Sequence, residues 1–183
     1  LMAAFTVIEH VELGAAATTV TLDDGGSSIP TSYDHLLIKA SIRNDNASYY
    51  RGSAIQLGTG GTIDTGSTYS NTVLYTTSAT PISSREAART ELVNVFYQGN
   101  SGTADTFGSV SIWIPNYTAS TFKQLLCTSC VEGATTTDAQ WVEAITAGLW
   151  ANTGAVTSVL MATNGSGDFM QYSTFTLYGV TGA

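Results

Sequence analysis

The closest approach to a chemical motif in this sequence is the cysteine pair Cys127 and Cys130, in the segment LLCTSCVEG. A CxxC spacing can be a redox couple or half of a zinc site. Zinc would need two further ligands, and the two histidines, His10 and His35, lie far upstream without tight spacing. A redox pair normally opens a helix that follows a strand, whereas this segment has the pattern of a strand that ends in a glycine turn. We therefore interpret both thiols as ordinary packed side chains and predict no metal and no cofactor.

Residues that could perform acid–base catalysis are present, but no catalytic pattern joins them. Neither histidine lies near a nucleophile-elbow motif, and we expect both on the surface. Glycoside cleavage needs two carboxylates across a cleft, and 14 acidic residues supply many accidental pairs. The candidates are Glu9, Glu12, Asp23, Asp24, Glu132, Asp138 and Glu143. We therefore predict no catalytic residues and a protein that is not an enzyme, with a carbohydrate-active or sugar-binding sandwich as an alternative class.

Three oxygen- or glycine-rich segments could bind ions or phosphate, and none has the required pattern. The stretch LGTGGTIDTG (57–66) lacks the lysine and the spacing of a phosphate-binding loop, so we interpret it as a flexible loop between strands. The turns DDGG (23–26) and NDN (44–46) do not match the twelve-residue calcium loop. Asn and Asp are favoured in turns because their side chains bond the local backbone. We expect no bound calcium.

The charge content excludes two classes of partner. Charged residues make up 11% of the 183 residues, and 14 acidic against 6 basic residues give a net charge of −8. Nucleic-acid binding and membrane-surface binding both need clustered Lys and Arg, which this chain lacks. No apolar run is long enough to span a bilayer. We therefore predict no nucleic-acid partner and no membrane partner.

The secondary structure predicted for the chain consists of short alternating segments separated by turn residues. In HLLIKASIR (35–43), alternation predicts that Leu36, Ile38, Ala40 and Ile42 face the core while Leu37, Lys39, Ser41 and Arg43 face solvent. The other predicted strands lie within 4–13, 18–26, 54–58, 70–77, 92–99, 107–117, 122–133, 141–152, 155–163 and 168–180. The tryptophans Trp113, Trp141 and Trp150 are expected to pack inside. The spacing predicts a single all-β sandwich domain over 1–183, with about ten strands.

One segment has helical character. SREAARTEL (84–92) holds four charged residues and a serine that could cap a helix. One or two helical turns, or an exposed charged loop, are the two interpretations.

Four segments resemble small virion proteins of tailed bacteriophages, especially marine and cyanobacterial phages. YSTFTLYGV (172–180) resembles their S-x-F-x-L-Y-G-I ending, and IPTSYDHLLIKASIRND (29–45) resembles their Ile-Pro-x-x-Tyr segment that continues to an Arg. STYSNTVLY (67–75) resembles a Tyr-Ser-x-x-x-Leu-Tyr element, and VSIWIPNYTASTFKQLL (110–126) resembles an Ile-x-Ile-Pro-x-Tyr strand followed by a Lys. The pieces span most of the chain. The resemblance implies an antiparallel, jelly-roll-like β-sandwich without catalytic residues.

The C-terminal segment makes physical sense in such a fold. Phe175, Leu177 and Val180 would face one way, and Gly179 would let the chain leave the sheet. A last strand tied into a sheet protects the end of a chain from fraying.

The resemblance implies a place on the outer surface of the virion, as a capsid decoration protein or as a tail-fibre or receptor-binding tip that contacts host glycans. A fibre needs an anchor and a stalk, whereas this chain reads as one domain that starts near Met2, which favours decoration. The implied partners are the major capsid protein and further copies of the chain, as a homotrimer. Candidate interface residues are Phe5, Val7 and Ile8 in the N-terminal segment, with Arg85 and Arg89 in the charged segment.

Overall fold

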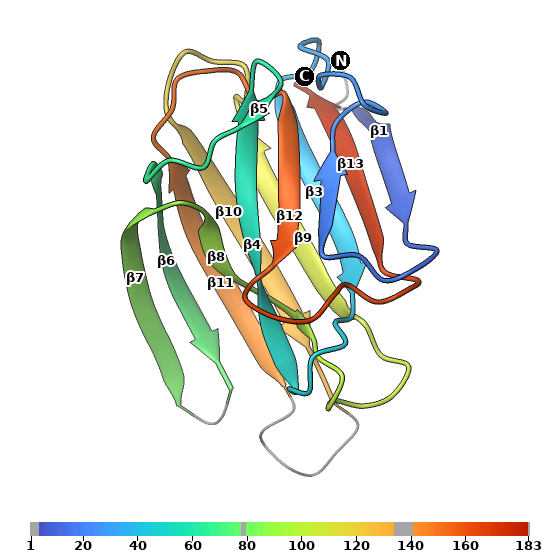
Figure 1. Cartoon of the computed structure of the whole chain (residues 1–183). Helices are drawn as coiled ribbons and strands as arrows, with labels where there is room; N and C mark the ends of the chain where they lie inside the picture. Colours follow the sequence, from blue (N-terminus) through green and yellow to red (C-terminus); the bar gives the residue numbers. More distant parts are fainter. Residues whose placement is uncertain (1–3, 78–79, 134–140, 183) are drawn as a thin grey trace.

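The computed structural model describes residues 4–77, 80–133 and 141–182, and every regular element in these ranges is a β-strand. Thirteen strands form two antiparallel sheets that pack face to face (Figure 1). The strands are β1 (Ala4–Glu12), β2 (Thr19–Leu22), β3 (His35–Ile42), β4 (Tyr50–Thr59), β5 (Thr62–Ile63), β6 (Tyr69–Thr76), β7 (Pro81–Arg89), β8 (Leu92–Gln98), β9 (Gly108–Pro115), β10 (Lys123–Val131), β11 (Val142–Trp150), β12 (Ser158–Thr163) and β13 (Thr174–Thr181). The all-β sandwich is confirmed. Each of the eleven predicted ranges overlaps a strand, and the count reaches thirteen because β5 and β7 form in segments that the sequence did not predict as strands.

Eight of these strands have jelly-roll connectivity. The first four strands alternate between the sheets, and each pairs with a strand from the other end of the chain. One layer runs β1-β13-β3-β9 and the facing layer runs β2-β12-β4-β8. This nesting of early strands against late ones is the double Greek key of a jelly roll. The jelly-roll prediction is therefore confirmed by the pairing of the strands.

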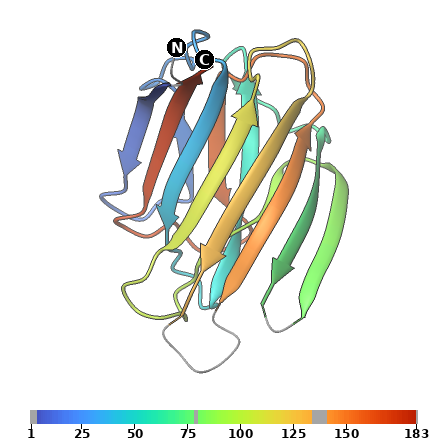
Figure 2. The same cartoon turned by 180° about the vertical axis from the view of Figure 1, so that it is seen from behind.

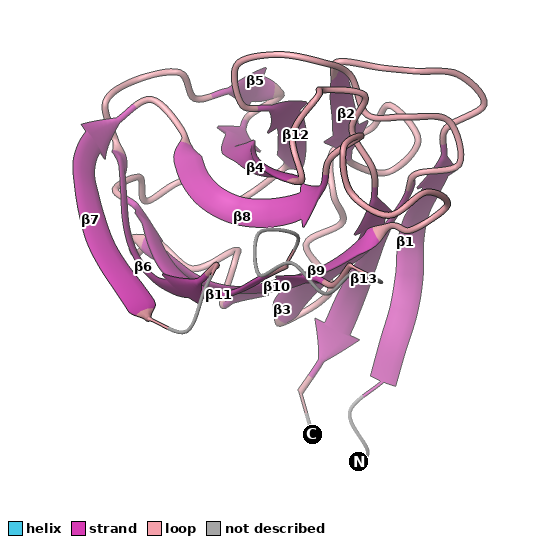
Figure 3. Cartoon of the chain, turned by 90° about the horizontal axis from the view of Figure 1, so that it is seen from below, coloured by secondary structure: helices cyan, strands magenta, loops and turns pink. Residues whose placement is uncertain are grey.

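Four of the remaining five strands enlarge one layer, and the fifth, β5, pairs with β4 in the other. β10, β11, β6 and β7 follow β9, so that this sheet contains eight strands in the order β1-β13-β3-β9-β10-β11-β6-β7 (Figure 2). β8 curves across the inner face of this extension (Figure 3). The inner face of the jelly-roll strands in this sheet is therefore covered by the facing layer, whereas the inner face of the extension is covered by β8.

The main core fills the space between the jelly-roll layers. The inward residues predicted for β3 are buried there, with Leu36, Ile38 and Ile42 at 0% exposure and Ala40 at 7%. The residues predicted to face inward on β13 are buried too, at 0% for Phe175. A second, smaller cluster lies under β8 and contains Val73, Phe96, Val131, Val142 and Ala144. Alternation along the strands fills both clusters, because only one face of each strand meets the facing layer.

The segment with helical character is a strand, so both interpretations of 84–92 were wrong. β7 covers Pro81–Arg89 and pairs with β6, with Arg85 opposite Thr72. The glycine-rich stretch also contributes to strands: Gly60 and Gly61 have φ of 57° and 80° and turn the chain between β4 and β5. Positive φ at two consecutive glycines is typical of a two-residue hairpin turn.

Three of the four segments that carry the phage resemblance lie side by side, whereas the segment 67–75 forms β6, farther along the same sheet. β13 pairs with β3, and β3 pairs with β9, so three of the segments form neighbouring strands. The Tyr117 hydroxyl donates to the carbonyl of Pro30, which joins the second and fourth segments. A methyl group at Gly179 would overlap the ring of Tyr33, so glycine here admits a packed ring. The prediction that the chain leaves the sheet at Gly179 is wrong, because β13 continues to Thr181.

Two basic side chains are buried among backbone carbonyls. Arg43, predicted to face solvent, is 6% exposed and follows the end of β3 at Ile42. Its Nη1 donates to the carbonyls of Thr103 and Thr106 at 2.7 and 2.8 Å. Lys123 is 1% exposed and donates to the carbonyl of Thr121 at 2.6 Å. Buried charges need such partners, so these cations fix the loops that hold the carbonyls.

Candidate functional site

The predicted interface residues lie at two opposite ends of one sheet. β1 and β7 are the two edge strands of the eight-stranded sheet, and Figure 3 shows them at opposite ends of the molecule. Phe5, Val7 and Ile8 are on β1, and Arg85 and Arg89 are on β7. The structure therefore does not bring the two groups together into one site.

At the β1 edge the apolar residues are exposed. The exposed fractions of Phe5 and Val7 are 60% and 54%, whereas Ile8 is half-buried and packs against the main core. Ile8 sits at a β-bulge between Val7 and Glu9, where the register with β13 shifts. A bulge reorients the strand locally, so the segment before it leaves its side chains in solvent.

At the β7 edge the charged residues interact with each other. Arg89 Nε lies 3.1 Å from Glu86 Oε2, in a partly exposed ion pair. Arg85 is exposed on the solvent face. The strand begins at Pro81, and Ala88 has a φ of 53°. Proline and an irregular backbone both interrupt the regular hydrogen-bond pattern that another strand would need.

Between the edges, apolar and aromatic side chains form a continuous row on the solvent face. The members, each a direct cross-strand partner of the next, are Val7, Tyr178, Leu37, Trp113 and Leu126, here called the outer row. Leu126 is 48% exposed, and the other inner members of the row are half-buried. Directly paired residues share one face of a sheet, so the row is one surface feature. Sequence reasoning missed it, although Leu37 and Leu126 occupy the positions where alternation expects polar residues.

Trp113 belongs to this row rather than to the core. It is half-buried, and the ring of His35 packs against it with 5.0 Å between centroids. Trp141 is also half-buried, whereas Trp150 is fully buried. The prediction that all three tryptophans pack inside is correct for Trp150 alone.

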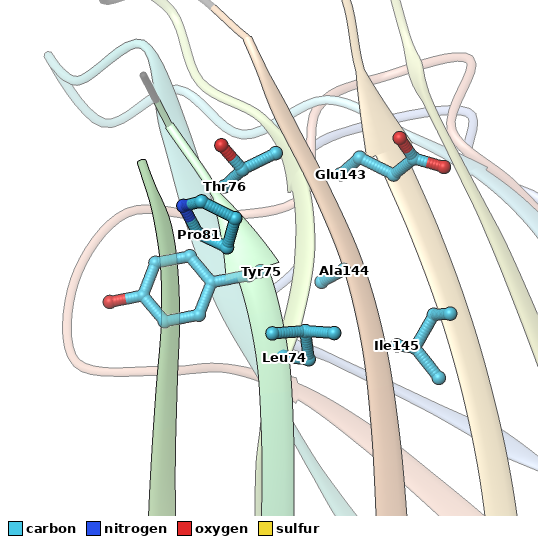
Figure 4. A pocket seen from close by; sticks show the side chains of 7 residues that line it. All are labelled: Leu74, Tyr75, Thr76, Pro81, Glu143, Ala144 and Ile145. Atoms are coloured by element: carbon cyan, nitrogen blue, oxygen red, sulfur yellow. The ribbon is translucent and has the colours of Figure 1, made fainter. Parts of the chain in front are cut away.

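Two shallow depressions lie on the same face, on either side of Glu143 and Ile145. Leu74, Thr76 and Pro81 line the first one, and Figure 4 shows Glu143 and Thr76 at one end of it. The second has a floor of small polar residues between Lys39 and Glu143, formed by Ser109, Ser111, Thr128 and Cys130. One cation, one carboxylate and several hydroxyls suit polar contacts with a protein surface or a sugar. Within the described residues, no cluster of three His, Cys, Asp or Glu side chains could hold a metal.

The CxxC pair is divided between the two faces of β10. Cys127 is buried and its pKa is raised to about 12 by burial, while Cys130 is exposed. Side chains three positions apart on a strand point to opposite faces, so the two thiols cannot form a redox couple in this conformation. The interpretation as packed thiols is correct for Cys127 and wrong for Cys130.

The remaining titratable candidates have structural contacts. His10 is exposed on β1, with Nδ1 at 2.8 Å from Thr176 Oγ1. His35 is half-buried rather than on the surface, and its Nδ1 accepts a hydrogen bond from the Asn116 N–H. Glu9 accepts a hydrogen bond from the backbone of Asp23 at 2.7 Å. Asp138 and Met2 lie outside the described residues.

No family model, curated protein or solved structure matches this chain. Among the described residues there is also no helix of the length and hydropathy needed to cross a membrane.

Proposed function

We propose that the chain is a non-enzymatic structural protein of a bacteriophage virion, a capsid decoration protein that binds the outer shell. The observation that carries the proposal is the outer row, a continuous apolar and aromatic strip across five strands of an uncovered sheet. Contiguous exposed apolar surface is characteristic of protein interaction sites. The resemblance of four segments to phage virion proteins, and the jelly-roll connectivity in which three of these segments are neighbouring strands, support the same assignment.

The surface suits a broad protein contact better than a small-molecule site. The described depressions are open and shallow, whereas small ligands are held in concave pockets that surround them. Trp113 and Tyr178 supply large, rigid contact area with a polar end, the residue types enriched in protein interfaces. The expected partner is the major capsid protein.

The copy number in purified virions tests this assignment. Quantitative mass spectrometry should find the chain at hundreds of copies, near-stoichiometric with the major capsid protein. A dozen or two copies would assign it to the tail or to a vertex instead. Its absence from virions would contradict the proposal.

A binding experiment tests the surface. Leu126→Glu places a charge in the outer row, and we expect it to weaken binding of purified protein to shells that lack it by at least tenfold. The matched control is Thr21→Glu, an exposed position on β2 in the facing sheet. Equal binding by both variants would show that the outer row does not contact the shell.

A tail-fibre or receptor-binding role that contacts host glycans is the second candidate. The specific observation that favours it is the polar depression between Lys39 and Glu143. Hydroxyl groups and single charges are suitable partners for sugar hydroxyls. In a glycan-binding assay this role predicts a signal that Lys39→Ala abolishes, and the absence of any signal would contradict it.

A further inference from the structure

We propose that two copies of this chain associate through β1, which pairs in antiparallel fashion with β1 of the second copy, centred on Thr6. The inference does not depend on the proposed virion role. It is carried by the residues of the β1 edge and by the register that they allow.

The outer edge of β1 is available for pairing with another strand. β1 pairs with β13, and no strand formed by the described residues lies on the opposite side of β1. Backbone N–H and C=O groups on such an edge form a template for another strand. Residues 4–7 are all exposed and include no proline, lysine or arginine. The usual features that prevent edge pairing are therefore missing from this segment.

The exposed segment of β1 is also self-complementary. Phe5 and Val7 are two positions apart and so lie on the same face, where Val7 is the first member of the outer row. In an antiparallel pair centred on Thr6, Phe5 lies opposite the partner's Val7, and Val7 lies opposite the partner's Phe5. Aromatic and β-branched residues form favourable cross-strand pairs. One register thus covers both of the most exposed apolar side chains of β1, twice.

The charges on β1 favour the register centred on Thr6. The chain carries a net charge of −8, and β1 holds Glu9 and Glu12 in its second half. A register centred on Glu9 would place Glu9 opposite the partner's Glu9, and like charges directly opposite are destabilising. The register centred on Thr6 keeps both glutamates away from their copies. The bulge at Ile8 also ends the regular part of the strand at this point.

The resulting dimer is closed. A two-fold axis perpendicular to the sheet joins the two β1 strands, so each copy uses the same edge and no further copy can add there. The outer rows of both copies face the same side and meet at the pair of Phe5 and Val7 residues. The two β7 strands become the ends of a sheet with twice the number of strands.

Sedimentation equilibrium over a range of concentrations tests the association. We expect a species of twice the 19.1 kDa mass of the chain. Val7→Lys should weaken the association at least tenfold. The melting temperature of the monomer, measured at concentrations too low for association, should stay the same because Val7 is exposed. The matched control, Leu74→Lys, makes the same kind of change at a 53% exposed residue of the same sheet and should leave the dimer intact. A monomer at all concentrations, a trimer, or a dimer insensitive to Val7→Lys would overturn the proposal.

Cross-linking tests the register. In a background that carries Cys130→Ser, we expect Thr6→Cys to form an intermolecular disulfide under mild oxidation, because directly opposite residues have Cβ atoms about 5 Å apart. Glu12→Cys should not cross-link in this register. Cross-linking through Glu12→Cys but not through Thr6→Cys would overturn the register. Absence of the chain from virions would contradict the proposed function and leave the dimer unaffected.

Discussion

The two edge strands of the eight-stranded sheet both have one side without a partner strand in the described structure, but they differ in the residue types that they carry there. β7 begins with a proline, carries Arg85, Glu86 and Arg89, and contains a residue with positive φ. β1 exposes Phe5 and Val7 on a segment without charge. Both edges have unpaired backbone groups, and only β7 has the features that prevent pairing. The difference indicates that β7 is protected against pairing with another strand and that β1 is suited to such pairing.

The parts of the core behind the two edges also differ. Behind β1, the β13 residues Phe175 and Leu177 are fully buried and apolar. Behind β7, the core includes Tyr69 and Trp150, which are hydrogen-bonded to Asp64: Trp150 Nε1 lies 2.8 Å from Asp64 Oδ2, and the Tyr69 hydroxyl donates to the Asp64 carbonyl at 3.0 Å. The two β13 residues therefore contribute through packing, whereas Tyr69 and Trp150 add directional polar contacts.

Removing apolar volume behind β1 should have the largest effect. Leu177→Ala leaves a cavity in a fully buried site and should lower the free energy of unfolding by about 2–5 kcal/mol. Leu74→Ala, at an exposed residue of the same sheet, should change it by less than about 0.5 kcal/mol. Urea denaturation measures both. Similar losses for the two variants would show that β13 is not part of the core that supports β1.

The polar core behind β7 should respond to alkaline pH. Burial raises the pKa of Tyr69, so above about pH 10 the unfolded state loses this proton while the folded state keeps it. The free energy of unfolding should therefore fall as pH rises through this range. Tyr69→Phe should reduce this fall.

The same variant should cost about 1–3 kcal/mol at neutral pH, because the Leu57 N–H, which donates to the Tyr69 hydroxyl at 2.9 Å, loses its acceptor. Denaturation curves at several pH values measure both effects. An unchanged pH dependence in Tyr69→Phe would contradict the assignment of the alkaline effect to this tyrosine.

Removing the protection of β7 should make the two edges more alike. Pro81→Thr combined with Arg85→Val removes the proline and one of the three charged side chains of β7 and puts β-branched residues in their places. We expect new concentration-dependent association, visible by light scattering, that persists when Val7→Lys is also present. A double variant that behaves like the parent protein would mean that these residues do not protect the edge.

The ion pair on β7 should contribute least. Glu86→Gln removes the partner of Arg89. Both side chains are partly exposed, at 42% for Arg89 and 34% for Glu86. A partly exposed pair contributes up to about 1 kcal/mol and is screened by salt. Thermal denaturation at low and high salt should show a small loss that disappears at high salt. A larger loss would indicate a structural role for Glu86 beyond this pair.

The sequence predicts those parts of the fold in which one face of a strand is buried. The alternation of Leu36, Ile38 and Ile42 predicts β3 because the core selects every second residue. β7 could not be predicted, because an exposed edge strand has no buried face, and its Glu, Arg and Ala residues favour helices when nothing else decides. Its conformation is set by pairing with β6, which lies outside the segment.

The candidate surface was predicted only in part, for the same reason. Phe5 and Val7 were identified by residue type, but the outer row depends on the register of five strands that are distant in sequence. Arg43 was misplaced because its guanidinium bonds carbonyls about 60 residues away in the chain, as with Thr103. Long-range partners of this kind leave no local pattern.

The pairing of the first strand with the last one has a mechanical consequence. Ala4 lies opposite Thr181, so the chain enters and leaves the sheet at neighbouring points (Figure 1). A tensile load between these points acts across the β1–β13 ladder and separates it one residue pair at a time, beginning at Ala4. A load applied along the strands, in shear, would be shared by all hydrogen bonds of the ladder, whereas this load acts on one residue pair at a time. The jelly roll would therefore open at low force along this axis, and β1 would be the first strand to come away.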